Sequence, residues 1–459
     1  MSQTLGSESN PLRIAIVGGG PSGFYAAESL FKSGLSVSVD MYDRLPTPYG
    51  LLRGGVAPDH QQMKSVAKAY ERVALSNPQF QFLGNIKIGE DVTIDDLKAC
   101  YDAIIFACGA ETDKHLGIPG ENLPGSYAAT EFVGWYNSHP NYRDRVFDLQ
   151  TAKSVAIIGQ GNVAIDVTRI LAKTTEELAG SDIAEYAKAA LAASSIQEIH
   201  LIGRRGPVQS AFTELEIKEL GELLDAEPVV DPGVIILGEA CQAELDEPTN
   251  NKARKNFAVL QRFAGRQSEG KPKKIYIRFF ESPVEIKGDT HVKSLVLENN
   301  RLAGPAGAQK AEPTGEKFEL ACDLVFRSVG YRGVAIPGVP FDEKRGVFPN
   351  VSGRLTNNGQ PVYGFYAVGW IKRGPSGVLG SNKPDSADTV KTLISDLDQL
   401  KPAENRDNQL IIEKLGHHQI VSFSDWKKIE AEEIRRGETL SKPRDKFSKI
   451  EEMLEAGRG

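Results

Sequence analysis

The segment Leu12-Arg-Ile-Ala-Ile-Val-Gly-Gly-Gly-Pro-Ser-Gly23 decides the fold of this chain. It predicts a β-branched strand, then a glycine turn with Gly18, Gly20 and Gly23, then a helix over residues 24–31. The first glycine permits the tight turn, the second lets a pyrophosphate approach the backbone, and the third lets the helix pack on the strand. Because the helix N-terminus offers free N–H groups and a positive dipole end, we expect a dinucleotide to bind here.

An acidic residue follows the next strand of this first module. The strand is expected at residues 36–42, and Asp43 stands directly after it. A carboxylate at this place is suited to accept hydrogen bonds from ribose hydroxyl groups. The combination of strand, glycine turn, helix and acid therefore indicates a complete dinucleotide-binding unit.

A second module repeats the pattern in Ser154-Val-Ala-Ile-Ile-Gly-Gln-Gly-Asn-Val-Ala164, with Gly159, Gly161 and Ala164 as the spaced small residues. Asn162 could add a side-chain amide at the phosphates. After the following strand, residues 198–202, the expected acid is replaced by Arg204 and Arg205. Two guanidinium groups bind a 2′-phosphate that a carboxylate would repel, so this module should prefer NADP(H) to NAD(H). Two different nucleotides, FAD first and NADP(H) second, are the simplest interpretation.

The overall composition is that of an ordinary globular chain. Its 459 residues exceed what one core supports, and 40% hydrophobic and 25% charged residues exclude disorder and fibrous repeats. A net charge of −7 argues against nucleic-acid binding, and the apolar runs are too short to span a membrane. The four cysteines form no metal-ligand pattern, so we expect no bound metal and a cytoplasmic protein, with a processed organellar form as the alternative.

We predict an α/β fold of two Rossmann-like dinucleotide-binding domains, the NADP domain inserted into the FAD domain. The FAD domain should comprise residues 1–110 and 325–459, and the NADP domain residues 111–324. Further strands are expected at residues 103–107, 274–280, 292–297, 324–329 and 364–368, with a helix at 384–397 and charged surface helices within 425–454.

Five segments resemble those of adrenodoxin reductase-like ferredoxin–NADP reductases. They are Arg44-Leu-Pro-Thr-Pro-Tyr-Gly-Leu-Leu-Arg-Gly-Gly-Val-Ala-Pro-Asp-His60, Gly159-Gln-Gly-Asn-Val-Ala-Ile-Asp166, Arg204-Arg-Gly-Pro-Val-Gln-Ser-Ala-Phe-Thr213, Arg327-Ser-Val-Gly-Tyr-Arg332 and Gly369-Trp-Ile-Lys-Arg-Gly-Pro-Ser-Gly377. The resemblance implies a glutathione-reductase-like fold and electron transfer from NADPH through FAD to a separate ferredoxin-type iron–sulfur protein.

The resemblance also implies site residues. Besides the glycines and Asp43, those for FAD are Ser22, Leu51, Ile86, Trp370, Gly377, Val378 and Leu379. Besides Gly159 and Gly161, those for NADP(H) are Lys114, Asn162, Val163, Ala164, Ile165, Arg204, Arg205, Glu216 and Gly377. His60 and Glu219 resemble a polar pair near the flavin, although a structural histidine is an equal alternative because hydride transfer needs no general base.

A cluster of basic residues could receive the iron–sulfur partner. Residues 252–278 hold nine basic residues against Glu269 as the one acid. Ferredoxins are typically acidic, so such a patch would favour docking by charge. The spacing of Arg254, Lys255, Arg262 and Arg266 could place several on one helix face, and a solvated surface helix is the plain alternative.

Other functions of two-dinucleotide flavoproteins require residues that can be compared with this sequence. Disulfide reductases need a paired cysteine beside the flavin, and this chain has none. The Ala57-Pro-Asp-His60 and Gly369-Trp370 segments speak against flavin monooxygenases. A ferredoxin–NADP reductase is the main hypothesis. The alternatives are an NADPH diaphorase acting on a quinone, and a non-catalytic protein that senses flavin and NADP.

Overall fold

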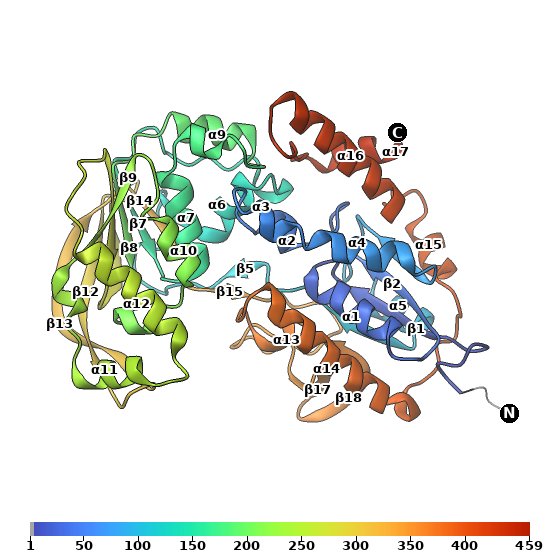
Figure 1. The fold of residues 1–459 in the computed structure, drawn as a ribbon. Coiled ribbons are helices and arrows are strands. Elements are labelled where there is room, and N and C mark those ends of the chain that lie inside the picture. Colours follow the sequence, from blue (N-terminus) through green and yellow to red (C-terminus); the bar gives the residue numbers. More distant parts are fainter. Residues whose placement is uncertain (1–3) are drawn as a thin grey trace. The chain divides into compact units, whose positions relative to one another are not determined.

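A computed structural model describes residues 4–459 (Figure 1). It divides into two compact units, which we describe separately. Unit 1 comprises Met1–Thr112 together with Gly330–Gly459, and unit 2 comprises Asp113–Val329. Unit 2 is thus inserted into the sequence of unit 1, and the predicted α/β class with two Rossmann-like sheets is confirmed.

Unit 1 is built on a seven-stranded sheet in the order β16-β17-β18-β4-β1-β2-β3. Its strands are β1 (Leu12–Val17), β2 (Val37–Tyr42), β3 (Phe80–Leu83), β4 (Ala103–Phe106), β16 (Asn350–Val351), β17 (Arg354–Asn357) and β18 (Gln360–Ala367). Strands β3, β2, β1, β4 and β18 are parallel, whereas β16, β17 and β18 form an antiparallel meander. Nearly all residues of β1 and β4 are buried, because helices or loops cover both faces of the sheet there.

Helices surround this sheet. They are α1 (Pro21–Phe31), α2 (Leu51–Gly54), α3 (Gln61–Lys64), α4 (Ala67–Ser76), α5 (Ile94–Cys100), α13 (Trp370–Arg373), α14 (Asn382–Ser395), α15 (Gln409–Leu415), α16 (Phe423–Thr439) and α17 (Ile450–Arg458), with 3₁₀ turns at Leu379–Ser381 and Leu397–Gln399. Helix α14 packs beside α1. The helices expected within 425–454 are α16 and α17, and α16 buries Trp426 and Glu433, so it is more deeply packed than its charge indicated.

Unit 2 holds a six-stranded parallel sheet in the order β6-β14-β7-β8-β10-β9 and a three-stranded antiparallel sheet β11-β12-β13. The strands are β6 (Ser126–Ala128), β7 (Ser154–Ile158), β8 (Glu198–Ile202), β9 (Ala226–Val230), β10 (Lys273–Arg278), β11 (Glu281–Lys287), β12 (Ser294–Ala303), β13 (Lys310–Ala321) and β14 (Leu324–Arg327). The helices are α6 (Ala129–Tyr136), α7 (Asn162–Ala172), α8 (Thr175–Leu178), α9 (Glu185–Ala192), α10 (Glu214–Glu219), α11 (Glu239–Asp246) and α12 (Asn251–Ala264), with 3₁₀ turns at Pro140–Tyr142, Pro207–Gln209 and Pro232–Ile235.

The chain passes between the units at β5 (Thr112–Asp113) and β15 (Tyr331–Arg332), which pair with each other. The hydroxyl of Thr112 donates to the carbonyl of Arg332 at 3.1 Å. None of the helices within residues 4–459 combines the length and the apolar character that crossing a membrane requires.

Candidate functional site

The first glycine turn connects β1 to α1 at the carboxyl edge of the unit 1 sheet. Gly18 has a φ of +114°, and a Cβ there would lie 2.5 Å from the carbonyl oxygen of Ala107. A Cβ on Gly23 would lie 2.3 Å from the carbonyl oxygen of Gly18, whereas one on Gly20 would come no nearer than 3.9 Å to its neighbours. The protein itself requires the first and third glycines, and the second keeps open the space that a phosphate needs.

The N-terminus of α1 is left available to a ligand. Gly20 precedes the helix and supplies no side-chain cap. The backbone N–H groups of Ser22 and Gly23 have no hydrogen-bond partner anywhere in residues 4–459. Unpaired N–H groups at a positive helix end suit a pyrophosphate, so the turn passes this test for a dinucleotide.

Asp43 lies directly after β2 and faces the turn. Its carboxylate accepts hydrogen bonds from the backbone N–H groups of Gly19, at 2.8 Å, and Leu45, at 2.9 Å. Burial raises the pKa of Asp43 to about 6, although these two N–H groups favour the charged form. The predicted ribose acid is therefore held rigidly at the edge of the turn.

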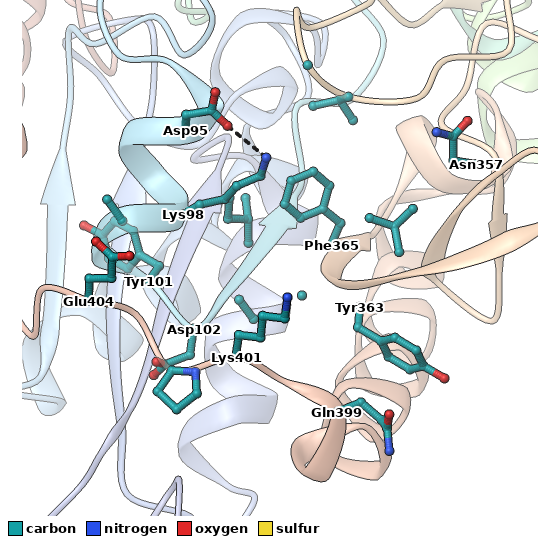
Figure 2. A pocket seen from close by; sticks show the side chains of 18 of the residues that line it. Asp95, Lys98, Tyr101, Asp102, Asn357, Tyr363, Phe365, Gln399, Lys401 and Glu404 are labelled. Atoms are coloured by element: carbon teal, nitrogen blue, oxygen red, sulfur yellow. Dashed lines mark hydrogen bonds and ion pairs between the residues drawn. The ribbon is translucent and has the colours of Figure 1, made fainter.

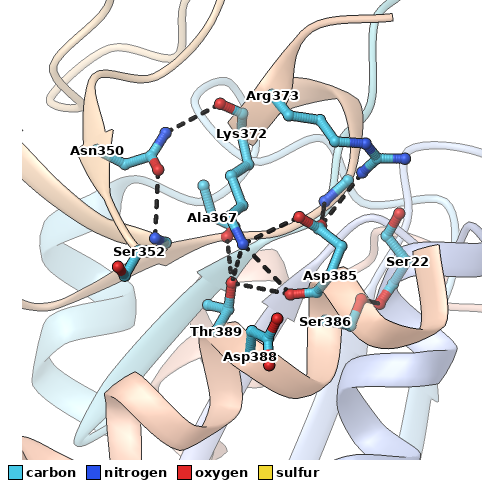
Figure 3. A network of polar contacts seen from close by, with 12 residues as sticks. Ser22, Asn350, Ser352, Ala367, Lys372, Arg373, Asp385, Ser386, Asp388 and Thr389 are labelled. Carbon is cyan, nitrogen blue, oxygen red and sulfur yellow. Dashed lines mark hydrogen bonds and ion pairs between the residues drawn. The ribbon is translucent and has the colours of Figure 1, made fainter. Parts of the chain in front are cut away.

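The loop from Gly369 to Leu379 lies at the same edge, beyond β18. Asp385 on α14 accepts from the backbone N–H of Gly369 at 2.7 Å and pairs with Lys372 at 2.9 Å and Arg373 at 3.2 Å (Figure 3). Gly369 has a φ of +72°, which only glycine adopts easily. This network fixes α13, whose first residue is Trp370.

The same network reaches the first turn. The Ser22 hydroxyl donates to the side-chain oxygen of Asn382 at 3.1 Å, and Ser386 donates to the Ser22 carbonyl at 3.0 Å. Arg373 also donates to Asn382, at 2.8 Å. Helix α14 thereby ties the phosphate turn to the loop that carries Trp370.

Other residues predicted for FAD lie in unit 1 in differing environments. Ile86 is buried, and the ring of Trp370 lies 5.2 Å from that of Tyr331. Leu51 and Val378 are exposed large apolar side chains. Apolar groups left at the surface beside a nucleotide turn are consistent with a flavin contact, and their roles stay predictions.

A separate cavity of about 920 Å³ lies at the opposite end of this sheet (Figure 2). Its lining includes Ala103 and Ile104 at the start of β4, with Phe365 beside them on β18. Lys98 at its wall is paired with Asp95 at 2.9 Å. Since nucleotides bind outside the carboxyl ends of parallel strands, this cavity is not the cofactor site.

The second glycine turn connects β7 to α7 in unit 2 with the same steric logic. Gly159 has a φ of +128°, and a Cβ there would lie 2.2 Å from the carbonyl oxygen of Ser328. A Cβ on Gly161 would meet nothing within 4 Å. Gly161 supplies no side-chain cap, and within residues 4–459 the N–H groups of Asn162, Val163 and Ala164 are unpaired. This turn is equally suited to a pyrophosphate.

Asn162 has an additional structural role. Its side-chain oxygen accepts from the backbone N–H of Thr213 at 2.9 Å, so the amide N–H₂ is the part that remains for a ligand.

Arg204 and Arg205 follow β8 and are both exposed. In the described chain, neither guanidinium forms an ion pair. They are therefore available to an anionic group.

The predicted residues Glu216 and Glu219 share one buried partner that the sequence interpretation missed. Arg169 on α7 is fully buried and pairs with Glu216 at 3.0 Å, Glu219 at 3.1 Å and Asp166 at 2.7 Å. This arrangement assigns both glutamates a structural contact. The sequence signal that could have revealed Arg169 is an arginine within an otherwise apolar helix.

His60 stands at the N-cap position of α3 in unit 1, and the predicted pair of His60 with Glu219 stays a prediction.

In the basic segment 252–278, more of the positive charges are engaged by acidic side chains or backbone carbonyls than the sequence indicated. Arg254 donates to the carbonyls of Leu245, Glu247 and Pro248. Ion pairs join Lys255 to Glu214, Lys274 to Glu227 and Arg278 to Glu281. Arg266 lies beyond the end of α12 and pairs with Glu269, so of the four residues it alone is not on the helix. Lys255 and Arg262 are the exposed members of the predicted set on α12.

Comparisons with known proteins agree with this geometry. Residues 12–220 match the pyridine nucleotide-disulphide oxidoreductase family model. The NADPH-ferredoxin reductase FprA of Mycobacterium tuberculosis is 44% identical over 98% of this chain and 100% of its own length. The human mitochondrial NADPH:adrenodoxin oxidoreductase is 40% identical over 96% of this chain and 91% of its own length.

The chain belongs to the adrenodoxin reductase-like ferredoxin–NADP reductases. A solved structure of Mycobacterium tuberculosis FprA in complex with NADPH superimposes with a TM-score of 0.91 at 43% identity, covering 98% of this chain and 100% of that one. The family predicted from the five sequence segments is thus confirmed. Within this reductase family, the two glycine turns are the expected places for two dinucleotides.

Proposed function

We propose that this chain is a ferredoxin–NADP(+) reductase that uses FAD and NADP(H). One observation carries the proposal: both glycine turns are open, and the residues that follow the next strand in each module have opposite charges. These residues are the carboxylate of Asp43 in unit 1 and the free guanidiniums of Arg204 and Arg205 in unit 2. The full-length similarity to reductases named for NADPH and ferredoxin supports it.

The first turn would hold FAD, and the second would hold NADP(H). Bound flavin supplies the chemistry, because it accepts a hydride and passes electrons singly. The N–H groups of Ser22 and Gly23 would bind the FAD pyrophosphate, and Asp43 would accept from its ribose. Helix α13, fixed by Asp385, would orient Trp370 and keep water from the reacting ring.

Unit 2 would hold the reducing nucleotide. The N–H groups at the start of α7 would bind the NADP(H) pyrophosphate, and Arg204 and Arg205 its 2′-phosphate. We propose the domain assignment accordingly, with FAD on the domain predicted at 1–110 and 325–459. His60 and Glu219 are proposed as polar residues near the flavin rather than as a required acid or base.

The electron acceptor is proposed to be an acidic ferredoxin-type iron–sulfur protein on a separate chain. Lys255 and Arg262, exposed on α12, would contribute to its docking. We further propose a cytoplasmic location. The four cysteines are all free thiols, which suits a reducing compartment.

The test is rapid-mixing reduction of a ferredoxin by the FAD-loaded protein with NADPH, at several salt concentrations. We expect fast turnover that slows as salt rises, because docking between opposite charges is screened. Ferricyanide and quinone reduction without ferredoxin turnover would instead indicate the diaphorase. Binding of both nucleotides without any electron transfer would indicate the sensor.

A further inference from the structure

The loop that carries Arg204 and Arg205 is held by its carbonyl groups. The N–H of Glu281 donates to the Gly203 carbonyl at 3.0 Å, and that of Phe280 donates to the Arg205 carbonyl at 3.1 Å. The side-chain amide of Asn300 donates to the Arg204 carbonyl at 3.0 Å. Three consecutive carbonyls are thus engaged by Phe280 in the β10–β11 turn, by Glu281 at the start of β11 and by Asn300 on β12.

The other side of this loop is left unpaired. Within residues 4–459, the backbone N–H groups of Arg204 and Arg205 have no hydrogen-bond partner, and both side chains are exposed. A loop whose carbonyls are tied back and whose N–H groups remain open is favourable for an anion. The local geometry therefore depends on what fixes the carbonyls.

Asn300 is the one side chain among these anchors. It is 9% exposed and belongs to β12, in the antiparallel sheet outside the six-stranded sheet. Its backbone N–H donates to the Phe280 carbonyl at 2.6 Å, and its amide donates to the Ser282 hydroxyl at 2.8 Å as well as to Arg204. The β12–β13 register shifts between Glu298 and Asn300, where the sheet meets the arginine loop.

The remaining anchors are backbone groups in a constrained turn. Phe280 has a φ of +60°, which is uncommon for an aromatic residue. A Cβ on Gly206 would lie 2.8 Å from the Phe280 ring, so the ring closes over the end of the arginine loop. Asn300 accordingly holds both sides of this contact, the turn through Phe280 and the loop through Arg204.

We propose that Asn300 is a positioning residue for nucleotide specificity, which sets the backbone of Arg204 and Arg205 for the 2′-phosphate of NADP(H). The inference rests on the proposed role of these two arginines. Without the Asn300 amide, the loop gains conformational freedom that 2′-phosphate binding must then remove. NADH lacks this phosphate, so its binding should be unaffected.

The test compares Asn300→Ala with the matched control Asn299→Ala, the neighbouring residue, whose amide contacts Glu316 instead. Both are made in the FAD-loaded protein, with ferricyanide as acceptor and with NADPH or NADH as donor. For Asn300→Ala we expect the NADPH KM to rise about fivefold, with kcat and the NADH KM unchanged. Binding of 2′,5′-ADP should weaken to a similar extent while that of 5′-AMP does not. Asn299→Ala should match the unmodified protein.

A second arm separates this inference from the proposed function. In Arg204→Ala/Arg205→Ala, adding Asn300→Ala should have no further effect on the NADPH KM, because the residues act as a unit. If the arginine variant alone leaves the NADPH preference intact, the 2′-phosphate assignment is wrong. If the arginine variant loses the preference but Asn300→Ala changes NADPH and NADH equally, or neither, Asn300 has no positioning role. Should Asn300→Ala fold poorly, Asn300→Ser gives the same comparison with less lost volume.

Discussion

At the end of β2 a carboxylate is folded back onto its own glycine turn, whereas at the end of β8 two guanidiniums remain at the surface. The turns themselves are alike, since each has a first glycine with positive φ and a second glycine that faces open space. Asp43 is fixed by two backbone N–H groups, while Arg204 and Arg205 are fixed through their carbonyls and keep their charges free. Under the proposed assignment, the turn determines that a dinucleotide binds, and the residue after the next strand determines which one.

The largest effect is expected when the side chains of Arg204 and Arg205 are removed. Arg204→Ala/Arg205→Ala should raise the NADPH KM by about 100-fold, because two charge-assisted hydrogen bonds are lost. The NADH KM should stay within about twofold, since NADH has no 2′-phosphate. Steady-state ferricyanide reduction measures both. Lys293→Ala, which removes an exposed unit 2 lysine paired with Asp289, is the charge control.

In the unit 2 turn, the second glycine should matter for nucleotide affinity and the first for the stability of the protein. Gly161→Ala adds a Cβ to open space, so we expect a normal melting temperature with NADPH binding weakened by about 30-fold. Gly159→Ala forces a strained φ and a clash with Ser328, and should lower the melting temperature markedly. Thermal unfolding and nucleotide titration distinguish the two. Equal loss of stability in both variants would contradict the steric difference.

Asp43 should make FAD binding depend on pH in one direction. Its pKa of about 6 is raised by burial, and the ionised form is the one that accepts from ribose. FAD affinity should therefore fall by up to about tenfold per pH unit below pH 6 and level off above it, as binding displaces the proton. Titration of the apoprotein with FAD from pH 5 to 8 measures this. Asp43→Ala should bind more weakly and lose this part of the slope.

The smallest effect is expected on the partner side. Lys255→Ala/Arg262→Ala should raise the ferredoxin KM about threefold at low salt, with ferricyanide turnover unchanged. Arg254→Ala is the informative comparison, because that guanidinium is engaged by three carbonyls. It should lower stability rather than alter the salt dependence. A ferredoxin KM that is unchanged in Lys255→Ala/Arg262→Ala would remove α12 from the docking surface.

The sequence was sufficient for features of the fold and of the candidate site that depend on local spacing. The glycine turns, Asp43 and the arginine pair are each read from a short stretch of chain, and the fold class follows from the repeated module. It was insufficient for contacts between residues that are distant in the chain. Asn300 holds Arg204 from 96 residues away, and Glu433 holds Arg53 from 380 residues away, neither with a local pattern. For the same reason, the sequence overstated the free charge of the 252–278 segment, whose acidic partners Glu214 and Glu281 lie outside it.

Unit 1 consists of two chain segments separated by unit 2, and this separation affects the order of folding during translation. The Gly18 turn emerges from the ribosome early, but β18 and α14, whose residues Asn382 and Ser386 hold Ser22, emerge only after all of unit 2. Unit 2 is continuous and can fold as soon as Val329 has emerged. A nascent chain therefore completes the turn at Gly159 before the turn at Gly18. With FAD at the Gly18 turn, as proposed, flavin loading would be a late event in the maturation of this enzyme.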